Sequence, residues 1–110
     1  MKLTIDHIHV KPDPKIEEYI EEKIGKLDHV LSRHAKDSAH ADVKLKAGPG
    51  RGQKKYICEV VVHLPQQIIT VNQAGITSEA AIDLAEAKLR IQLKKYKDKH
   101  VLNQRHKPVR

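Results

Sequence analysis

The stretch that most constrains the fold of this chain lies near its C-terminus, between residues 81 and 99. Its apolar residues recur at the three- and four-residue spacing of an α-helix, so one side of that helix must pack on a core. The core-facing side consists of Ile82, Ala85, Leu89, Leu93 and Tyr96. Thr77 or Ser78 can cap the first turn. The rest of the chain must supply a second layer that covers this side.

The net charge of the chain is concentrated in the same helix and in the residues after it. Residues 1–85 carry equal numbers of basic and acidic side chains, so the formal net charge of +7 resides in residues 86–110. Beside the core-facing side runs a basic ridge, which consists of Lys88, Gln92, Lys95 and Lys99. Arg90, Lys94 and Lys97 lie around the outside of the helix. A positive field that is this localised indicates a polyanionic partner.

The N-terminal quarter reads as a strand followed by a helix. Residues 2–6 alternate between polar and apolar, which predicts a half-buried strand, and the alternation breaks over residues 7–10, where we expect a bulge or a turn. Asp13 and Pro14 then suit the N-cap and the first position of a helix. Apolar residues from 16 to 31 fall on one side of this predicted helix.

Two lysines interrupt the pattern of this first helix. Lys23 falls inside its apolar arc and Lys26 at the edge of that arc. A lysine in such a place either extends past its neighbours to water or faces a partner, and the pattern leaves both explanations open.

Three further strands are expected in the middle of the chain, over residues 39–47, 56–64 and 68–74. A glycine-rich basic loop over residues 48–55 joins the first two and a short turn joins the last two, which predicts an antiparallel meander. The basic side chains around this loop are Lys46, Arg51, Lys54 and Lys55. The loop does not match a phosphate-binding P-loop, because no Gly-Lys-Ser/Thr run opens a helix after it.

The order β-α-β-β-β-α predicts a two-layer α+β fold with both helices packed on one face of a four-stranded sheet. We expect a single domain over residues 1–100 and a mobile basic tail over residues 101–110. The chain holds one cysteine and lacks both a signal-peptide pattern and an apolar run as long as a membrane span. We therefore expect a cytoplasmic protein without membrane contact.

The sequence contains no recognisable catalytic constellation. His7 and His9 could share one face of an extended segment, but a metal site needs three or four ligands and no others stand at a suitable spacing. Cys58 occupies an inward strand position, so we expect a buried, inert thiol. The carboxylates of the first helix read as solvated surface charges. We predict no enzyme activity, no metal, no cofactor and no small-molecule substrate.

The scarcity of aromatic residues limits how a nucleic acid could be bound. The chain has three tyrosines, no phenylalanine and no tryptophan. Proteins that read single strands stack bases on aromatic platforms, which this chain does not supply. Binding should therefore depend on phosphates, sugars and RNA shape, and it should be strongly sensitive to salt.

Three stretches of the chain resemble the ribosome hibernation promoting factors, also called ribosome-associated translation inhibitors. They are residues 2–27, residues 59–64 and residues 80–97, and the last is the most specific, with its Lys88-Leu89 and Gln92-Leu93-x-Lys95-Tyr96-Lys97. The resemblance extends to about residue 100 and implies a β-α-β-β-β-α fold similar to double-stranded RNA-binding domains. Because the sequence ends soon afterwards, the resemblance implies a short form of the family.

The resemblance implies binding to ribosomal RNA of the small ribosomal subunit, in the channel for mRNA and tRNA, where occupancy inhibits translation and protects idle ribosomes. It places the site in the groove between the two helices, and we expect the protein to be monomeric when free. The predicted RNA-binding residues are Lys23, Lys26, Lys88, Arg90, Lys94, Lys95, Lys97 and Lys99, with Arg51, Lys54 and Lys55 as possible loop contacts. Ile91 departs from the family pattern, which often has arginine there. The alternative is a general double-stranded RNA-binding module or RNA chaperone that acts off the ribosome.

Overall fold

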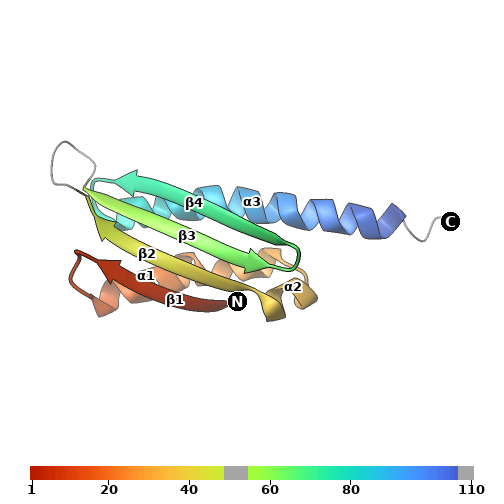
Figure 1. Cartoon of the computed structure of the whole chain (residues 1–110), viewed down its shortest axis with the longest axis horizontal. Coiled ribbons are helices and arrows are strands. Elements are labelled where there is room, and N and C mark those ends of the chain that lie inside the picture. Colours follow the sequence, from red (N-terminus) through yellow and green to blue (C-terminus); the bar gives the residue numbers. More distant parts are fainter. Residues whose placement is uncertain (49–54, 107–110) are drawn as a thin grey trace.

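The computed structural model describes residues 1–48 and 55–106, with side chains placed through Lys99. The elements are β1 (Lys2–Ile8), α1 (Pro14–Lys23), the 3-10 helix η1 (Gly25–Val30), α2 (Arg33–Ser38), β2 (His40–Ala47), β3 (Tyr56–Leu64), β4 (Gln67–Gly75) and α3 (Ser78–His106). They form two layers, a four-stranded sheet and helices that cover one of its faces (Figure 1). The predicted α+β fold is confirmed.

The sheet has the strand order β1-β2-β3-β4 and is mixed. The strands β2, β3 and β4 form the predicted antiparallel meander, with Val43 paired to Val60 and Val60 paired to Val71. The strand β1 pairs in parallel with β2, a feature that the sequence pattern did not specify. The chain leaves the sheet at His9, whose φ of 57° confirms the expected turn after the first strand.

The core lies between the sheet and the helices, and buried residues alternate with less buried ones along the central strands. On the sheet these are Ala41, Val43, Leu45, Cys58, Val60, Val62 and Leu64. On α3 all five predicted core-facing residues are buried. Alternation and helical spacing are local properties of the sequence, which explains why these buried sets could be predicted.

The first helix differs from the prediction, because the apolar run up to residue 31 is not one α-helix. The chain breaks it into α1, η1 and α2, yet Ile20, Ile24 and Leu27 are all buried, since a 3-10 turn also returns a side chain to the same side every three residues. At Gly25 an added Cβ would lie 3.1 Å from Leu3 Cδ1, so the chain passes close to β1 there. Ser32 then caps α2 by accepting a hydrogen bond from the Ala35 amide.

The last helix is longer than expected. It continues through residue 106, so residues 101–106 of the expected mobile tail are helical, and residues 107–110 lie outside the described part of the chain. No glycine or proline interrupts the sequence between Ser78 and Pro108, which allows the helix to continue. At 1.5 Å per residue α3 is about 43 Å long, and it projects past the end of the sheet (Figure 1).

Candidate nucleic-acid interface

The orientation of α3 is fixed at both ends of the sheet. At its start, Thr77 Oγ1 accepts a hydrogen bond from the Ala80 amide at 3.0 Å, which confirms one of the two predicted caps. A Cβ on Gly75 would lie 2.6 Å from the Ala81 nitrogen, so only glycine lets β4 approach the helix this closely. Further along, the Tyr96 hydroxyl donates a hydrogen bond of 2.9 Å to the Pro65 carbonyl in the β3–β4 turn. These contacts determine which side of α3 faces water.

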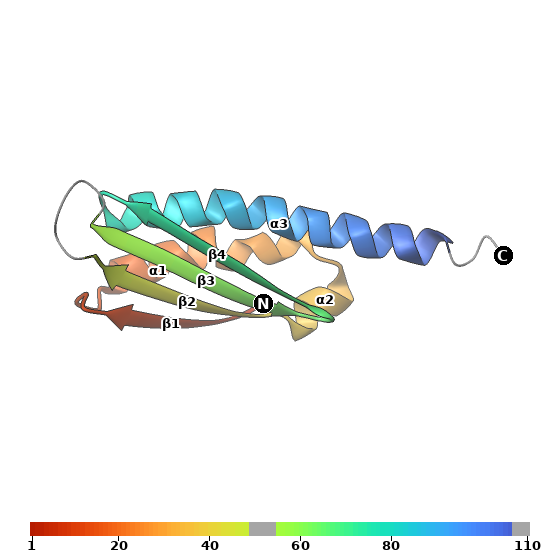
Figure 2. The same cartoon turned by 45° about the horizontal axis from the view of Figure 1, so that its top comes forward.

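The helices α1 and α3 lie side by side and run in the same direction (Figure 2). The Tyr19 hydroxyl of α1 donates a hydrogen bond of 2.5 Å to Asp83 Oδ1 of α3, and Lys23 Nζ lies 3.5 Å from the same oxygen. Lys23 Nζ also lies 5.9 Å from the centre of the Tyr19 ring. The half-buried Lys23 is therefore paired with the neighbouring helix, where the sequence offered only extension to water or a separate partner.

The contact at Asp83 divides the outer surface of α3 into two flanks. At 100° per residue, Arg90, Lys94 and Lys97 lie on the same flank as Asp83, which we call the groove flank because it faces α1 and η1. The basic ridge lies on the opposite side of the helix, which we call the free flank. The ridge therefore does not line the groove between the helices, where the resemblance placed it. Which of these residues contact RNA stays a prediction.

The groove flank carries acids as well as bases. Glu86 is only 7% exposed, and its carboxylate accepts a charge-assisted hydrogen bond from the Arg90 guanidinium one helical turn later. Arg90 itself remains 59% exposed in its side chain. The hydrogen bond to Asp83 and, secondarily, burial raise the pKa of Tyr19 to about 12. Asp83, Glu86 and Arg90 on this flank are thus engaged in contacts within the protein.

The free flank carries charge that is not engaged in this way. Lys88, Lys95 and Lys99 are exposed, and none forms an ion pair within the part of the chain that the structure describes. Lys94 and Lys97 on the groove flank and Lys26 on η1 are also exposed. The six basic residues predicted on α3 are therefore exposed, in one row on each flank, whereas Lys26 is exposed on η1 and Lys23 is half-buried on α1.

The predicted loop contacts are only partly placed. Arg51 and Lys54 lie outside the described residues, whereas Lys55 is exposed where β3 begins. Lys46, at the end of β2, forms an ion pair of 3.4 Å with Glu59 on the adjacent strand. Of the loop side chains that the structure describes, Lys55 is thus the one that remains available to an anion.

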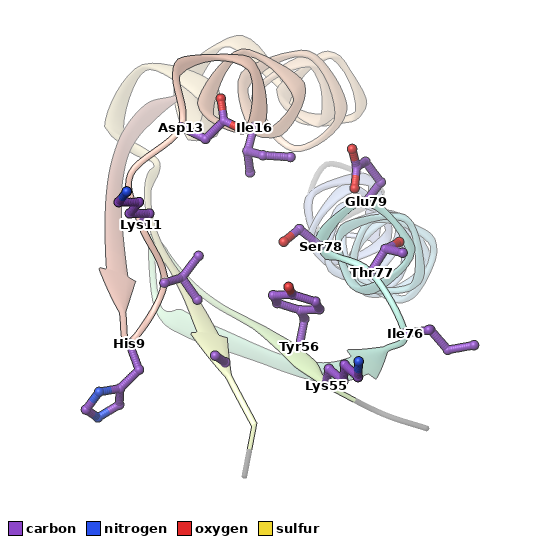
Figure 3. Close-up of a pocket in the computed structure, with 12 residues that line it drawn as sticks. His9, Lys11, Asp13, Ile16, Lys55, Tyr56, Ile76, Thr77, Ser78 and Glu79 are labelled. Carbon is purple, nitrogen blue, oxygen red and sulfur yellow. The ribbon is translucent and has the colours of Figure 1, made fainter. Parts of the chain in front are cut away.

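A pocket of about 610 Å³ lies at the opposite end of the molecule from the C-terminus of α3, between the starts of α1 and α3. The Tyr56 ring points into it, while the side chains of His9 and Ile76 point away (Figure 3). Its charged lining is balanced, with Lys11 and Lys55 against Asp13 and Glu79. This balance makes the pocket a poorer site for a polyanion than the outer surface of α3. Sequence reasoning missed the pocket, because four separate segments form it.

His7 and His9 do not assemble a metal site. His7 Nε2 lies 2.9 Å from Glu17 Oε2, whereas His9 is exposed and points outward (Figure 3). Within the described residues, no cluster of three or more histidines, cysteines and carboxylates is arranged to hold a metal ion. Burial raises the pKa of the Cys58 thiol to about 12, so this thiol stays protonated at neutral pH.

Sequence reasoning also missed a polar cluster on the open face of the sheet. Asp42 lies 2.7 Å from His40 Nε2 and 3.4 Å from His63 Nε2, because β2 and β3 pair His40 with His63. The hydrogen bond from His40 holds the pKa of Asp42 below its ordinary value. This cluster lies on the face opposite the helices and does not contribute to the surface of α3.

Among the helices of the described residues, none has an apolar stretch that could span a membrane.

Two comparisons with solved structures agree with the fold. The N-terminal domain of Thermus thermophilus protein Y matches with a TM-score of 0.74 at 25% identity, over 87% of this chain and 99% of that one. A ribosomal subunit interface protein from Coxiella burnetii matches with a TM-score of 0.69 at 23% identity, over 89% of this chain and 99% of that one.

Sequence comparisons then identify the family. A ribosome hibernation promotion factor from Picosynechococcus sp. (strain ATCC 27264 / PCC 7002 / PR-6) is 30% identical over 107 residues, which are 96% of this chain and 54% of the relative. The chain thus spans about half the length of that curated relative. Residues 3–101 match the model of the family described as sigma 54 modulation protein / S30EA ribosomal protein. Because that match covers nearly the whole chain, the protein belongs to this family.

Proposed function

We propose that this protein is a ribosome hibernation factor that binds ribosomal RNA of the small ribosomal subunit in the channel for mRNA and tRNA. Occupancy of that channel inhibits translation and protects idle ribosomes. The protein acts in the cytoplasm without catalysing a reaction. The observation that carries the proposal is the exposed basic surface of α3, on a fold whose relatives include proteins named for ribosome hibernation and for the ribosomal subunit interface.

The distribution of charge along α3 supports a phosphate-rich partner. Between Ser78 and Ala87 the helix has three carboxylates and no basic residue, whereas from Lys88 to Lys99 it has six basic residues and one carboxylate. The six basic residues are exposed, and only Arg90 has a carboxylate partner within the described residues. Such a surface attracts a polyanion through many weak contacts, each of which releases counterions.

The two flanks give this surface a shape as well as a charge. The basic rows lie on opposite sides of a helix that is roughly 10 Å wide with its side chains. A helix with phosphate contacts on both sides suits insertion between two RNA segments rather than docking on one. Tyr19 and Tyr96 form hydrogen bonds within the protein, so α3 binds by shape and charge without stacking bases.

The test measures the affinity of the full chain for purified small subunits at several salt concentrations. Replacing Lys88 and Lys95 together (K88E/K95E) should lower that affinity about 100-fold, because two phosphate contacts become repulsive. The matched control is K2E/K44E, which reverses two exposed lysines on the open face of the sheet. The control should change the affinity by less than about threefold.

The outcomes distinguish a specific site on the ridge from a general effect of net charge. An unchanged affinity for K88E/K95E would show that the ridge is not the site, and an equal loss in both double variants would show that only net charge matters. A parallel titration with a free RNA duplex at matched salt tests the alternative. Equal affinity for the duplex and for small subunits would favour a general RNA-binding module that acts off the ribosome.

A further inference from the structure

The outermost side of α3, between the two flanks, is apolar in its first half. Leu84 and Ile91 are 47% and 54% exposed and lie seven residues apart, so they share one side of the helix two turns apart. Ala80 and Ala87 complete a line with spacings of four, three and four, which we call the α3 stripe. This is the spacing at which one helix packs against another. Ala80 lies against Gly75 at the end of β4, whereas Leu84, Ala87 and Ile91 are exposed.

The helical layer that carries the stripe is mainly acidic along α1 and the first half of α3, and mainly basic along the second half of α3. Along α1 and in the first turn of α3, the exposed acids include Glu18, Glu22 and Glu79, with Lys15 as an exposed base at the start of α1. Further along the same layer, the exposed bases include Lys26, Lys94, Lys95 and Lys97. Because α1 and α3 run in the same direction, the two acidic stretches coincide and the layer is polarised along its length (Figure 2). A surface with this pattern is complementary to itself after a half-turn.

We propose that a second copy of this chain packs antiparallel on the α3 stripe, with Leu84 of each copy against the partner's Ile91. A twofold axis near Ala87 brings the acidic start of each α3 to the basic half of the other. Glu79 then lies within a helical turn of the partner's Lys94. A parallel arrangement would instead place like charges side by side, so the charges select the antiparallel one.

The association is weak, for two reasons that the structure supplies. The apolar part of the interface consists of a single leucine and a single isoleucine from each copy, which is less than a stable dimer buries. In addition, Lys88 of each copy lies close to the twofold axis, where the two like charges oppose pairing. A dilute solution therefore contains monomers, as the sequence led us to expect, and dimers form as the concentration rises.

Pairing covers the groove flank of both copies, including Lys94 and Arg90. Dimers and RNA would then compete for the same surface of α3. That competition rests on the proposed function, whereas the self-association does not.

The test is sedimentation equilibrium of the full chain without RNA, from about 5 to 500 µM at low ionic strength. The wild type should show a monomer–dimer equilibrium, and L84S/I91S should weaken it at least tenfold. The control I68S/I76S replaces two isoleucines that are 61% exposed on other surfaces, and it should leave the equilibrium unchanged. A wild type that stays monomeric throughout, or an equal effect of both double variants, would overturn the proposal.

A charge-swap experiment tests the antiparallel arrangement. E79K and K94E should each self-associate less than the wild type, because each places like charges across the interface. Mixed in equal amounts, they should form a heterodimer, since the lysine introduced in one variant then meets the glutamate introduced in the other. If the mixture associates no more strongly than either variant alone, the antiparallel pairing is wrong. The affinity of L84S/I91S for small subunits, measured when the chain is dilute and monomeric, should match that of the wild type. If the proposed function fails, the sedimentation experiment still tests self-association independently.

Discussion

The two flanks of α3 carry similar numbers of basic residues, yet their neighbours give them different properties. On the groove flank, Glu86 binds Arg90 within the helix, and Asp83 holds Tyr19 and Lys23 of α1. On the free flank, the lysines of the basic ridge have no such partners among the described residues. The difference shows that available charge depends on what the fold places beside each residue, and not on the charge count of the helix alone.

This comparison predicts two kinds of variant. Changes on the free flank should affect RNA binding and leave the stability of the fold unaltered, because exposed charges without partners contribute little to stability. Changes at the partnered residues of the groove flank should affect stability, with or without RNA. Variants on each flank can show whether the two flanks contribute independently to RNA binding and to stability.

The largest effect is expected when both flanks lose their unpaired charges. K88Q/K95Q on the free flank and K94Q/K97Q on the groove flank should each flatten the slope of log affinity against log salt by about 1.4–1.8, if each lysine contacts one RNA phosphate. The four-lysine variant should lower the affinity for small subunits about 1000-fold at physiological salt. Titrations at several salt concentrations measure both quantities. If one pair leaves the slope unaltered, RNA contacts only the other flank.

A smaller effect is expected on the groove flank when the buried carboxylate loses its partner. R90A should lower the free energy of unfolding by about 1–2 kcal/mol, because Glu86 would remain buried without its charge-assisted hydrogen bond. E86Q/R90A should recover most of that loss, since an uncharged amide is cheaper to bury. Urea unfolding of the two variants and the wild type gives the comparison. An R90A protein as stable as the wild type would mean that the pair contributes only charge and no stability.

The smallest effect is expected from pH at the contact between α1 and α3. The folded protein holds the pKa of Tyr19 at about 12, above the ordinary value of 10.0, so the unfolded chain loses this proton first as pH rises. The resulting stabilisation is complete below pH 10 and should disappear between about pH 10 and 12. Ultraviolet titration of tyrosinate should show one tyrosine fewer at high pH in Y19F. In D83N the same group should titrate lower, whereas an unaltered titration in D83N would exclude Asp83 as the cause.

Much of this fold could be predicted from the sequence, because its strands and the core side of α3 follow local periodicities. Ala41 to Leu45 alternate, and Ile82 to Tyr96 recur at helical spacing. The break at Gly25 could not be predicted in the same way, since a 3-10 turn preserves the apolar spacing of an α-helix. The parallel pairing of β1 with β2 depends on the path of the whole crossover, which no single stretch of sequence specifies.

The sequence predicted that the basic residues of α3 face outward, but it did not predict how the fold arranges them. The spacing of Lys88, Lys95 and Lys99 places them on one line of a helix. The side of α3 on which α1 packs depends on the contact between Tyr19 and Asp83, which are 64 residues apart in the chain. Because of that contact, Lys23 lies beside the groove flank and away from the ridge. A helical wheel of α3 alone gives no information about this contact.

The projection of α3 beyond the sheet has a thermodynamic consequence for binding. After Tyr96, which is tied to Pro65, the helix extends past the layer beneath it (Figure 1). Its last turns therefore depend on intrinsic helix propensity, which is marginal for a short segment. Repulsion between Lys94 and Lys97 and between Lys95 and Lys99 weakens them further. A polyanion that neutralises these lysines removes the repulsion and stiffens the helix. The proposed RNA binding would therefore be coupled to completion of the helix, and adding salt alone should increase the helical content of the free protein.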